Sequence, residues 1–513
     1  MTETSVPPAV VKPDPVLLDG ATLTPRKLAL IAREGAIAEL TGEARARNDA
    51  AREALAAYLA RGGQVYGVTT GVGALRDYRV PDGQREQYSL SLLRSHACGA
   101  GLPLPAHVVR AAMATRANQI GAGGAGVAPE LLDALIGALN AGLSPFTREL
   151  GSLGTGDLTN LADIALALVG EGRVWRGDDL LDAAAAMSDA GIEQARLGPR
   201  DGLAFMSSNA VSIARAALLV VDSRRLLDAW LSVAALSFEA AAADPIALDP
   251  RIHSARHRPG QAAVAARMRE LLAGVTERRR EATPLGIQDP YPFRAQPQVD
   301  GTVHDALLVL EETVSHELNF AGENALIVAA DGVALPNGNP HAAPLANAID
   351  NLRTALAQSA ALIAARVSTL LDAELTGLPP FLARPEHVGF ESGALVLEYT
   401  AHAAVAEVRS LVTPVAAQSV SVSRGVESHS SLAPIAARRA QEAIAALRVA
   451  VATELVVAVR ALRLAGQEPL GAGNQSLWAA ATELLDPDLG DRPLGPDVEL
   501  ARALIAGWRL ELG

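Results

Sequence analysis

The sequence predicts a mainly helical protein in which a long helical bundle is joined to a smaller, mixed N-terminal domain. Half of the 513 residues are hydrophobic but only 3% are aromatic, so alanine and leucine must fill the core. These small aliphatic residues favour closely packed helices over sandwiches. Continuous Ala, Leu and Val faces run for roughly 20 to 36 residues, which exceeds ordinary globular helices and indicates a bundle extended by oligomerisation.

The helical pattern and its interruptions divide the chain into three parts. Residues 1–22 hold four prolines and no periodicity, so they predict a flexible arm. Residues 23–208 form a predicted N-terminal active-site domain, which begins with helices near 24–37 and 44–60, and residues 209–513 form a helical bundle and C-terminal helical domain. The long helices of this last part are expected near residues 209–244, 260–281, 301–331, 343–376, 391–412 and 433–466.

Charge and cysteine content exclude several classes of function. A net charge of -13 argues against a nucleic-acid or anionic-membrane partner, since both need a basic surface. Cys98 is the only cysteine, so the chain can form no internal disulfide and no cysteine cluster for a metal, and we expect no metal site. No 18-residue uncharged apolar run and no basic or apolar leader are present, which predicts a cytoplasmic protein.

A glycine-rich stretch followed by a helix is the centre of the predicted active-site domain. Gly151, Gly154 and Gly156 allow a tight turn and a close approach to another group, because glycine lacks Cβ. Apolar residues then recur at helical spacing from Leu158 to Leu168, so the loop delivers its amides to a positive helix N-terminus. The loop lacks the Lys-Ser/Thr ending of a phosphate loop, and an ordinary tight turn is the alternative.

This stretch resembles the signature of the histidine and phenylalanine ammonia-lyase family, in which Gly-Ser-Val/Leu-Gly-Ala-Ser-Gly-Asp-Leu precedes a helix. In that family the Ala-Ser-Gly triad cyclises and dehydrates into the electrophile methylideneimidazolone. This chain instead has Gly154-Thr155-Gly156, one residue fewer, with threonine in place of serine. Gly156 could still attack the carbonyl of Gly154, but loss of water from Thr155 would leave a more hindered ethylidene carbon. The interpretation that we favour is an unmodified loop and no prosthetic group, with processing as the alternative.

Two N-terminal motifs extend the resemblance. Tyr66-Gly67-Val68 begins a segment similar to the family's Tyr-Gly-Val/Ile-Asn-Thr-Gly-Phe-Gly, whose tyrosine is the general base. A tyrosine base needs positive neighbours that lower its pKa from about 10. His96 lies in a segment similar to Ser-His-Ala-Ala-Gly, the form that histidine-specific members carry, so the resemblance implies contact with an imidazole-like ring. Core packing is the alternative for both residues.

Four later motifs complete the series. Asp201-Gly202-Leu203 begins a match to Glu-Gly-Leu-Ala-Leu-Leu-Asn-Gly-Thr, in which Ser207 replaces the asparagine that helps to build the electrophile. The segment 288–298 is nearly Gln-Asp-Pro-Tyr-Ser-Leu-Arg-Cys-X-Pro-Gln, which implies that Arg294 grips the substrate carboxylate with its planar fork and that Tyr291 lies near the leaving group. A structural ion pair is the alternative for Arg294.

The remaining two motifs give two further candidate residues. Asn339 falls in a segment similar to Gly-Asn-Phe-His, with proline in place of the aromatic residue, and it would help to hold the carboxylate. Glu427 falls on the glutamate of Gln-Glu-Asp-His-Val-Ser that meets the imidazole in histidine-specific members. A solvated turn is the alternative for Glu427 and His429.

Together the seven motifs span roughly residues 60–435 in the family's order. The resemblance implies the family's helical fold, similar to that of fumarase and aspartase, and a homotetramer in which several subunits build each active site. The predicted function is therefore carbon-nitrogen lyase activity on a histidine-like or aromatic 2-amino acid derivative. Because the residues that make the electrophile have changed, the expected leaving group is one that is already activated, such as a quaternary ammonium, as in the trimethylamine-releasing relative ergothionase.

Three alternatives stay open at this point. Ser392-Gly393-Ala394-Leu395 offers no lysine where an ergothionase would be expected to place one, so neither ergothioneine nor hercynine need be the substrate. A conventional ammonia-lyase or aminomutase with a processed triad is a second possibility. The third is a helical scaffold that binds a carboxylate ligand without turnover. The sequence does not distinguish elimination from addition.

Overall fold

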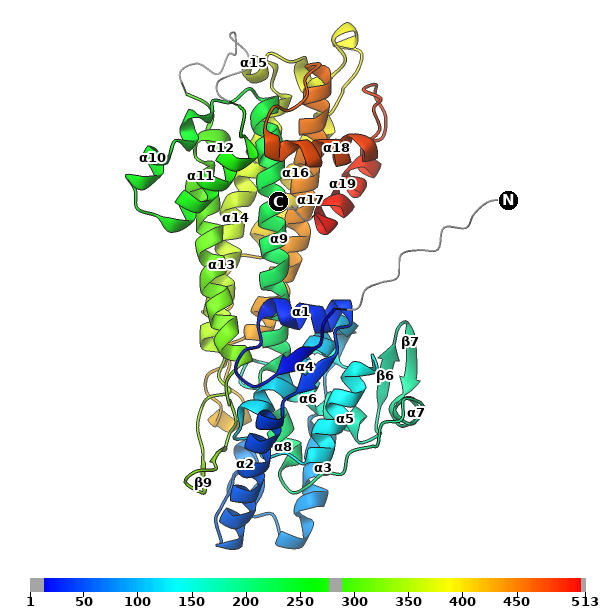
Figure 1. Cartoon of the computed structure of the whole chain (residues 1–513), viewed down its shortest axis with the longest axis vertical. Helices are drawn as coiled ribbons and strands as arrows, with labels where there is room; N and C mark the ends of the chain where they lie inside the picture. Colours follow the sequence, from blue (N-terminus) through cyan, green and yellow to red (C-terminus); the bar gives the residue numbers. More distant parts are fainter. Residues whose placement is uncertain (1–12, 276–287, 509–513) are drawn as a thin grey trace, which may run out of the picture. The chain divides into compact units, whose positions relative to one another are not determined.

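A computed structural model describes residues 13–275 and 288–508 of the chain (Figure 1). The fold is mainly helical, as the sequence predicts, with a few short strands. The chain packs into two compact units. The first unit consists of the chain up to Val221 together with Glu311–Asn347 and Val415–Ala437, and the second consists of the remaining segments. The predicted boundary at residue 208 stays a prediction.

The first unit is built around a buried helix, α4 (Ala106–Ala122). Residues Ala111–Gly121 of this helix are buried without interruption, because α1, α2 and α5 pack against it. Its neighbours are α1 (Pro25–Glu34), α2 (Gly42–Ala60), α3 (Arg85–His96), α5 (Pro129–Asn140), α6 (Leu158–Leu168), α7 (Ala183–Asp189) and α8 (Asp201–Met206). The start of α1 follows local rules, since the Thr24 hydroxyl accepts the Lys27 amide and Pro25 occupies the first turn.

Short β-strands pair with one another and connect the loops of this unit. β1 (Val16–Leu18) pairs in parallel with β2 (Ala38–Leu40), and Leu18 is fully buried. Thus part of the predicted arm at 1–22 is anchored, while residues 1–12 lie outside the described residues. The antiparallel pairs are β3 (Ala100–Pro103) with β5 (Arg148–Leu150), β4 (Ser144–Pro145) with β6 (Arg173–Arg176), and β6 with β7 (Asp179–Asp182).

The predicted helix at 301–331 is wrong beyond residue 318. Helix α13 (Gln296–Leu318) ends earlier, where Asn319 donates its side-chain amide to the Ser315 carbonyl at 2.8 Å. The chain then forms an antiparallel hairpin of β8 (Leu326–Val328) and β9 (Val333–Leu335). Asp-Gly is a strong hairpin signal, and the turn here contains Gly332 with φ +62° after an aspartate.

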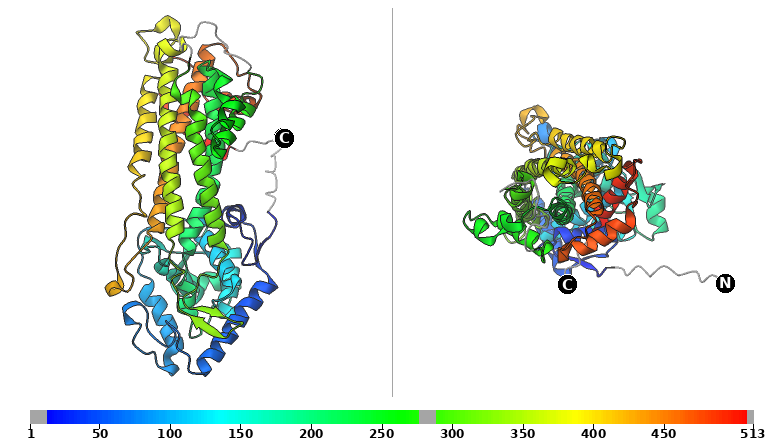
Figure 2. Two further views of the ribbon diagram at one scale, coloured as in Figure 1. Left: turned by 90° about the vertical axis from the view of Figure 1, so that its left-hand side faces the viewer. Right: turned by 90° about the horizontal axis from the view of Figure 1, so that it is seen from above.

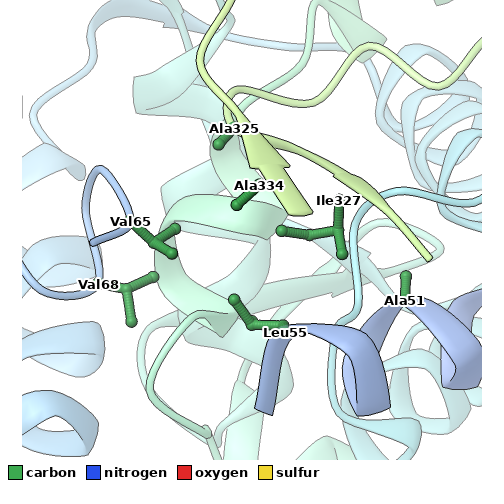
Figure 3. Packing of buried hydrophobic residues seen from close by; sticks show 7 residues of the cluster. All are labelled: Ala51, Leu55, Val65, Val68, Ala325, Ile327 and Ala334. Atoms are coloured by element: carbon green, nitrogen blue, oxygen red, sulfur yellow. The ribbon is translucent and has the colours of Figure 1, made fainter. Parts of the chain in front are cut away.

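A small apolar cluster fixes the loop that carries Tyr66. Val65 and Val68, on either side of that tyrosine, pack with residues of α2 and of the β8–β9 hairpin (Figure 3). The full cluster is Ala51, Leu55, Val65, Val68, Ala325, Ile327 and Ala334. Burial of such side chains contributes roughly 1.5–3 kcal/mol for each large aliphatic residue, so the cluster stabilises a loop that has little secondary structure of its own.

The second unit is a bundle of long helices. Segments of α9 (Ala210–Ala240), α13, α14 (Ala343–Leu371) and α17 (Ala433–Leu464) run side by side in it, and α16 (Leu395–Ser410) accompanies them (Figures 1 and 2). Smaller elements of this unit include α10 (Pro250–Ser254), α11 (Pro259–Leu271), α12 (Tyr291–Arg294), α15 (Ala373–Thr376), α18 (Gln475–Leu484) and α19 (Gly495–Gly507). The predicted helix at 260–281 therefore ends at Leu271, and residues 276–281 lie outside the described residues.

Polar side chains connect the bundle helices within the apolar core. Arg366 of α14 holds Glu454 of α17 through Nε–Oε1 at 2.6 Å and Nη2–Oε2 at 3.0 Å, and both side chains are fully buried. Ser237 of α9 donates to Glu454 Oε1 at 2.7 Å. Trp230 of α9 donates to Asp300 of α13 at 2.9 Å. These contacts satisfy groups that would otherwise be costly to bury.

Two helical stretches, Asp201–Ala240 and Ala343–Leu371, are long and apolar enough by composition to cross a membrane. Their most apolar windows are 94% and 61% buried inside the protein. Packing against other helices therefore accounts for the apolar composition, as it does for core helices of a bundle.

Candidate active site

The first unit contains a cavity of about 700 Å³ that brings most of the predicted site residues together. Tyr66, His96, Thr155, Ser207 and Glu427 all line it. They come from five separate segments of the sequence, yet each segment belongs to the same compact unit. A concave, partly apolar pocket with a few convergent polar groups is the usual form of a small-molecule site.

Tyr66 is held in this cavity by its own loop. Its hydroxyl oxygen accepts the Gly73 amide proton at 2.7 Å. Burial raises the pKa of the Tyr66 hydroxyl above its usual value, the bond from Gly73 lowers it, and the charges of Glu427 and Arg76 raise and lower it respectively. A tyrosine base is expected to have positive neighbours that lower its pKa, but within the described residues the effect of burial on the pKa of Tyr66 outweighs that of the single arginine.

The Tyr66 loop packs tightly against the segment that carries Glu427. Ser423 Oγ accepts the Ala74 amide proton at 2.8 Å, and the Val422 amide donates to the Glu427 carbonyl at 2.9 Å. Gly73 has φ +55°, and a Cβ on it would lie 2.5 Å from Ser423 Oγ. Glycine is therefore required there, and the close packing brings the Glu427 carboxylate to the wall of the tyrosine pocket.

His96 ends α3, and its ring has a defined tautomer. The Nδ1 atom lies 2.8 Å from the Leu92 carbonyl oxygen, which can only accept a hydrogen bond. Nδ1 therefore carries a proton, and in the neutral ring Nε2 is an acceptor. The side chain lines the cavity, so it presents an acceptor to any ligand that offers an N–H group.

The Gly154-Thr155-Gly156 loop is fixed by contacts to its backbone. The Gly154 carbonyl accepts the Ala342 amide at 3.1 Å and the Ser431 hydroxyl at 2.8 Å. The Gly156 amide donates to Asn209 Oδ1 at 3.0 Å. These bonds leave the Thr155 side chain at the cavity wall, between two buried glycines.

The backbone conformation and the close neighbours of residue 154 favour glycine. Gly154 has φ +83°, a conformation that residues with Cβ rarely adopt. A Cβ at this position would lie 2.0 Å from Ser431 Oγ and 3.0 Å from the Ala433 amide nitrogen. An alanine at this position would therefore be strained by the positive φ and would require the Ser431 side chain to move.

Asp157 anchors the start of α6 from inside the protein. Its carboxylate accepts the Ser212 amide at 2.7 Å and the Ser212 hydroxyl at 2.9 Å. Burial raises the pKa of Asp157 to about 6, although both bonds from Ser212 and the charge of Arg215 lower it. The residue joins the glycine loop to the first turn of α9, so it is a support of the site and not part of its wall.

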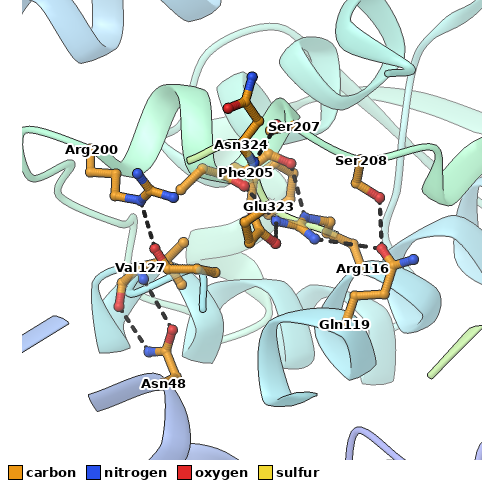
Figure 4. A network of polar contacts seen from close by, with 12 residues as sticks. Asn48, Arg116, Gln119, Val127, Arg200, Phe205, Ser207, Ser208, Glu323 and Asn324 are labelled. Atoms are coloured by element: carbon orange, nitrogen blue, oxygen red, sulfur yellow. Dashed lines mark hydrogen bonds and ion pairs between the residues drawn. The ribbon is translucent and has the colours of Figure 1, made fainter. Parts of the chain in front are cut away.

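A buried polar network lies under the Ser207–Asn209 turn (Figure 4). Arg116 of α4 donates to the Phe205 carbonyl at 3.0 Å and to the Ala204 carbonyl at the end of α8, and it pairs with Glu323 at 2.8 Å. Ser208 donates to Gln119 of α4 at 2.6 Å. The carbonyl of Ser208 in turn accepts the Asp157 amide at 2.7 Å, so the network supports the glycine loop through this turn.

A pair of histidines closes another part of the cavity wall. His341 Nε2 and His429 Nδ1 are 2.9 Å apart, with ring centroids 5.0 Å apart. His341 is half-buried and His429 is exposed. Because a hydrogen bond between two imidazole nitrogens needs one donor and one acceptor, the two rings share a single proton at this contact.

The other predicted residues lie outside this cavity. Asn339 is not among its lining residues, and the Asn339 amide donates to Asn337 Oδ1 at 2.9 Å. Tyr291 and Arg294 form α12 in the second unit, where the guanidinium of Arg294 lies 4.0 Å from the Tyr291 ring centroid. Arg294 also donates to the Asp289 carbonyl at 2.9 Å, and Tyr291 is 64% exposed. The roles predicted for these residues stay predictions.

Among the described residues, the cavity wall has no permanently positive side chain. The described residues that line it include the carboxylate of Glu427 and three histidines, but no lysine or arginine. In the same part of the chain, no group of three or more His, Cys, Asp or Glu side chains is placed to hold a metal ion. An acidic ligand would need a permanent cation from outside these lining residues.

Two features of the site were missed from the sequence. Asn209 lies two residues beyond Ser207, in the same motif, and it binds both the Gly156 amide and the Pro340 carbonyl. His341 was part of a quoted motif but was given no role, and its contact with His429 spans 88 residues of sequence. The asparagine could have been noticed as a nearby amide in a motif that had lost one, whereas the histidine contact has no local signal.

Long bundle helices, a half-buried tyrosine and a glycine loop at a helix N-terminus fit the mainly helical fold expected of a carbon-nitrogen lyase of the ammonia-lyase type. A sequence profile of the aromatic amino acid lyases matches residues 23–483. The chain therefore belongs to the aromatic amino acid lyase family, and it is a carbon-nitrogen lyase.

Individual relatives agree with this assignment. The histidine ammonia-lyase of Symbiobacterium thermophilum is 36% identical to this chain over 96% of both sequences. The crystal structure of the ergothioneine-degrading enzyme ergothionase from Treponema denticola, in complex with desmethyl-ergothioneine sulfonic acid, has a TM-score of 0.89 at 27% identity and covers 96% of this chain and 98% of that one. Tyrosine aminomutase from Streptomyces globisporus has a TM-score of 0.91 at 29% identity, with 96% and 97% covered.

Proposed function

We propose that this lyase eliminates an already activated amine, such as a quaternary ammonium group, from a histidine-like 2-amino acid derivative without a methylideneimidazolone group. The observation that carries the proposal is the Gly154-Thr155-Gly156 loop, whose surroundings do not fit an Ala-Ser-Gly triad. An alanine methyl at 154 would overlap Ser431 Oγ, and the residue between the glycines is not serine. We therefore assign no step to an internal electrophile.

The type of leaving group follows from the absence of an internal electrophile. Elimination removes a weakly acidic Cβ proton and expels the group on Cα, and a primary ammonium leaves badly because it readily loses a proton and becomes a worse leaving group. A quaternary ammonium cannot lose a proton and departs as a neutral amine. Tyr66 lies in the cavity with its hydroxyl oriented by the Gly73 amide, and as phenolate it would take the Cβ proton.

The histidine-like ring is favoured by the polar groups of the wall. His96 presents Nε2 as an acceptor, and Glu427 presents a carboxylate. The two N–H groups of a protonated imidazole ring would bind both acceptors, whereas a phenyl ring would leave these partly buried groups without partners. The relative from Symbiobacterium thermophilum is named a histidine ammonia-lyase, which supports the same choice.

The substrate carboxylate requires a cation that the described cavity wall lacks. We propose that Arg294 supplies it within a homotetramer, with Tyr291 beside the leaving group, so that another subunit completes each active site. The planar guanidinium of Arg294 suits bidentate binding of a carboxylate, and it is already oriented by its contacts to Asp289 and Tyr291. A positive group brought near Tyr66 in this way would also lower the pKa of its hydroxyl. Asn339 remains a candidate for a second contact to the carboxylate.

Turnover of defined substrates tests the proposal. Purified protein is incubated with the trimethyl betaine of histidine, with its aromatic counterparts and with the matching primary amino acids. We expect near-ultraviolet absorbance of a conjugated acrylate, and release of trimethylamine, from the betaines. Product from histidine and none from any betaine would contradict the proposal.

The second candidate function is a conventional ammonia-lyase or aminomutase with a processed triad. It is favoured by the Gly154 carbonyl, whose two hydrogen-bond donors would polarise it toward attack, and by the structural likeness to tyrosine aminomutase. Intact-mass measurement distinguishes the two functions, because cyclisation and dehydration remove two waters. We expect the mass of the unmodified chain.

A scaffold without turnover is the remaining alternative. Carboxylate-bearing ligands would then raise the melting temperature without being consumed, and Tyr66→Phe would leave that stabilisation unchanged. Measuring both thermal shift and turnover on the same samples therefore separates ligand binding from catalysis.

A further inference from the structure

We propose that the permanent positive charge of the substrate's own ammonium group activates Tyr66, so that the base of this site becomes reactive only when a cationic ligand is bound. This inference rests on the proposed elimination and gives a second reason for a quaternary amine in the substrate. Its basis is the set of groups around the Tyr66 hydroxyl, together with the covalent geometry of any substrate whose Cβ proton that hydroxyl removes.

The free site holds Tyr66 as a neutral phenol. Burial raises the pKa of the Tyr66 hydroxyl and Glu427 raises it further, although the bond from Gly73 and the charge of Arg76 lower it. The other titratable groups that face the hydroxyl or share its cavity carry no fixed positive charge. They are Tyr88 of α3, whose own pKa is raised by burial and by Tyr66, and the wall histidines His96, His341 and His429. At neutral pH the base is therefore almost entirely protonated.

The hydrogen bonding of Tyr66 nevertheless favours ionisation. Its oxygen accepts the Gly73 amide at 2.7 Å, and such a bond becomes stronger when the oxygen is negative. Among residues 13–275 and 288–508, no protein group accepts the Tyr66 hydroxyl proton. Loss of that proton therefore breaks no hydrogen bond to the described protein and strengthens one. The site needs only a positive charge close to the phenolate oxygen.

Covalent geometry places the substrate's ammonium close to this oxygen. For proton transfer, Cβ must approach the phenol oxygen to about 3–3.5 Å. The nitrogen and Cβ are both bonded to Cα, so they are about 2.5 Å apart. The nitrogen is then within about 6 Å of the phenol oxygen in every productive pose. At an effective dielectric constant of about 20, a unit positive charge at that distance lowers the pKa of a phenol by about two.

Glu427 connects ligand binding to the same effect. Its Oε1 atom lies 4.0 Å from the position of a Cβ on Gly73, the residue whose amide holds the Tyr66 oxygen. In the proposed function Glu427 binds the protonated ring of the substrate, and this pairing offsets the negative charge that raises the pKa of Tyr66. The described wall has no lysine or arginine, so the ligand supplies positive charge that the wall lacks.

The substrate's carboxylate is also bonded to Cα, and it would offset the ammonium if its charge stayed unpaired. In the proposed function the guanidinium of Arg294 pairs with this carboxylate. The ammonium is then the excess charge beside Tyr66. The activation of Tyr66 therefore depends on the same carboxylate clamp as substrate binding.

A quaternary amine keeps its charge throughout the pH range in which Tyr66 ionises. An α-amino group loses its proton at a lower pH than a tyrosine does, so a primary amine becomes neutral before a tyrosine ionises. A quaternary ammonium has no proton to lose. The same permanent charge therefore first stabilises the phenolate and then departs as a neutral amine.

The step balances in atoms and electrons. The Tyr66 hydroxyl proton passes to water when the cationic substrate binds. The phenolate oxygen then takes the Cβ proton, the electron pair of that C–H bond forms the Cα–Cβ double bond, and the electron pair of the Cα–N bond stays on nitrogen. The products are an acrylate and a neutral amine, no acid is required, and Tyr66 is again a neutral phenol.

Two ligands of the same shape test this inference without turnover. The trimethyl betaine of imidazolylglycine has no Cβ hydrogen and cannot undergo the elimination, and in its analogue a tert-butyl group replaces the trimethylammonium group. The tyrosinate absorbance of the wild-type protein minus that of Tyr66→Phe isolates Tyr66 among the six tyrosines. We expect the titration midpoint of Tyr66 to be about two pH units lower with the betaine than with the tert-butyl analogue. Equal midpoints, or no binding of the betaine, would overturn the proposal.

Kinetic pH profiles give a second readout, because kcat/KM reports the free enzyme and kcat reports the bound complex. For betaine elimination, kcat should reach its plateau about two pH units below kcat/KM. Glu427→Gln should move the kcat/KM profile toward the kcat profile, since it removes a charge that raises the pKa of Tyr66. Glu53→Gln, at an exposed position of α2 outside the cavity, is the matched control and should leave both profiles unchanged. Coincident profiles in the wild-type protein would overturn the proposal.

The two readouts separate this inference from the proposed function. If no betaine is eliminated but the Tyr66 midpoint still falls when the imidazolylglycine betaine binds, the proposed function fails and the activation by charge stands. If betaines are eliminated and the midpoint is the same with both ligands, the activation by charge fails and the proposed elimination stands.

Discussion

Each unit contains a buried arginine–glutamate pair, and the two pairs differ in how completely the carboxylate is hydrogen-bonded. In the second unit, Arg366 binds both carboxylate oxygens of Glu454, and Ser237 adds a further donor. In the first unit, Arg116 reaches only one oxygen of Glu323, and the other oxygen, Oε2, is buried without a partner in the described chain.

The difference follows from the other groups that each arginine contacts. Arg366 joins two long helices, whereas Arg116 directs two of its donors to the carbonyls of Ala204 and Phe205, just before the turn that supports the glycine loop. A fully satisfied buried pair fixes the register of a bundle, while a partly satisfied one is tolerated where it orients a site. We therefore expect changes to the pair in the second unit to affect stability, and changes to the pair in the first unit to affect activity.

The largest effect is expected at Tyr66. Tyr66→Phe removes the base but keeps the ring, so turnover should fall by about 10²–10⁴, equivalent to about 3–5 kcal/mol, with little change in melting temperature. The measurement is acrylate formation from a betaine alongside thermal unfolding. Tyr78→Phe, at an exposed position, is the control and should retain full activity. Substantial activity in Tyr66→Phe would remove the tyrosine from the mechanism.

In the helical bundle of the second unit, we expect a substitution to lower stability and to leave activity unchanged. Glu454→Gln leaves Arg366 buried beside a neutral partner, and loss of one member of such a pair typically costs 3–5 kcal/mol. Chemical denaturation should show this loss, whereas kcat per folded molecule should stay near wild type. Glu323→Gln should cost less stability, because Oε2 already lacks a partner, but it should lower kcat. Equal losses of stability and of kcat in the two variants would mean that the two pairs have the same role.

The pH dependence of stability tests the support beneath the glycine loop. Burial raises the pKa of Asp157 from 3.8 to about 6, so the folded protein binds this proton more tightly than the unfolded chain. The corresponding stabilisation, about 3 kcal/mol, is fully present below pH 3.8 and is lost as the pH rises through 6. Asp157→Asn should flatten this part of the pH profile of the unfolding free energy. An unchanged profile would show that the carboxylate ionises normally.

The pH dependence of the rate tests the tyrosine itself. Because the pKa of Tyr66 is raised above 10.0 in the described chain, the phenolate fraction increases about tenfold for each pH unit between 7 and 9. In the absence of a partner's cation, kcat/KM should rise in parallel. A plateau that begins below pH 9 would indicate that a positive group from another subunit lowers this pKa.

The sequence predicted the fold well where local rules dominate. Thr24-Pro25 marked the start of α1, and the apolar faces located α9, α14 and α17 to within a few residues. The hairpin at β8–β9 was missed because its apolar residues continued the helical pattern of α13. The Asp331-Gly332 turn was a local signal that distinguished the hairpin from a helix.

The site was predicted in part, and for a physical reason. Motifs placed Tyr66, His96, Thr155, Ser207 and Glu427, which the fold brings to one cavity. Sequence patterns do not encode contacts such as that between His341 and His429, which depends on how two distant loops bind the same glycine carbonyl. Nor do they reveal that burial outweighs the positive neighbour of Tyr66. Whether these residues act in catalysis stays a prediction.

The smallest effect is expected for a substitution at Gly154, in the glycine loop of the first unit. Gly154→Ala places a methyl 2.0 Å from Ser431 Oγ in a left-handed conformation, which should cost about 1–3 kcal/mol of stability. Thr155→Ser, at the adjacent position, removes only a methyl at the cavity wall and serves as the control. Denaturation curves of both variants measure the difference.

The double variant Gly154→Ala/Thr155→Ser recreates the composition of an Ala-Ser-Gly triad in a loop that is one residue shorter. If the close neighbours of residue 154 exclude the triad, this protein should be destabilised like Gly154→Ala, and its intact mass should show no loss of water. Loss of two waters, with gain of activity on histidine, would show that the surroundings of the loop still support cyclisation. The single glycine, and not its close neighbours, would then account for the difference between this chain and its relatives.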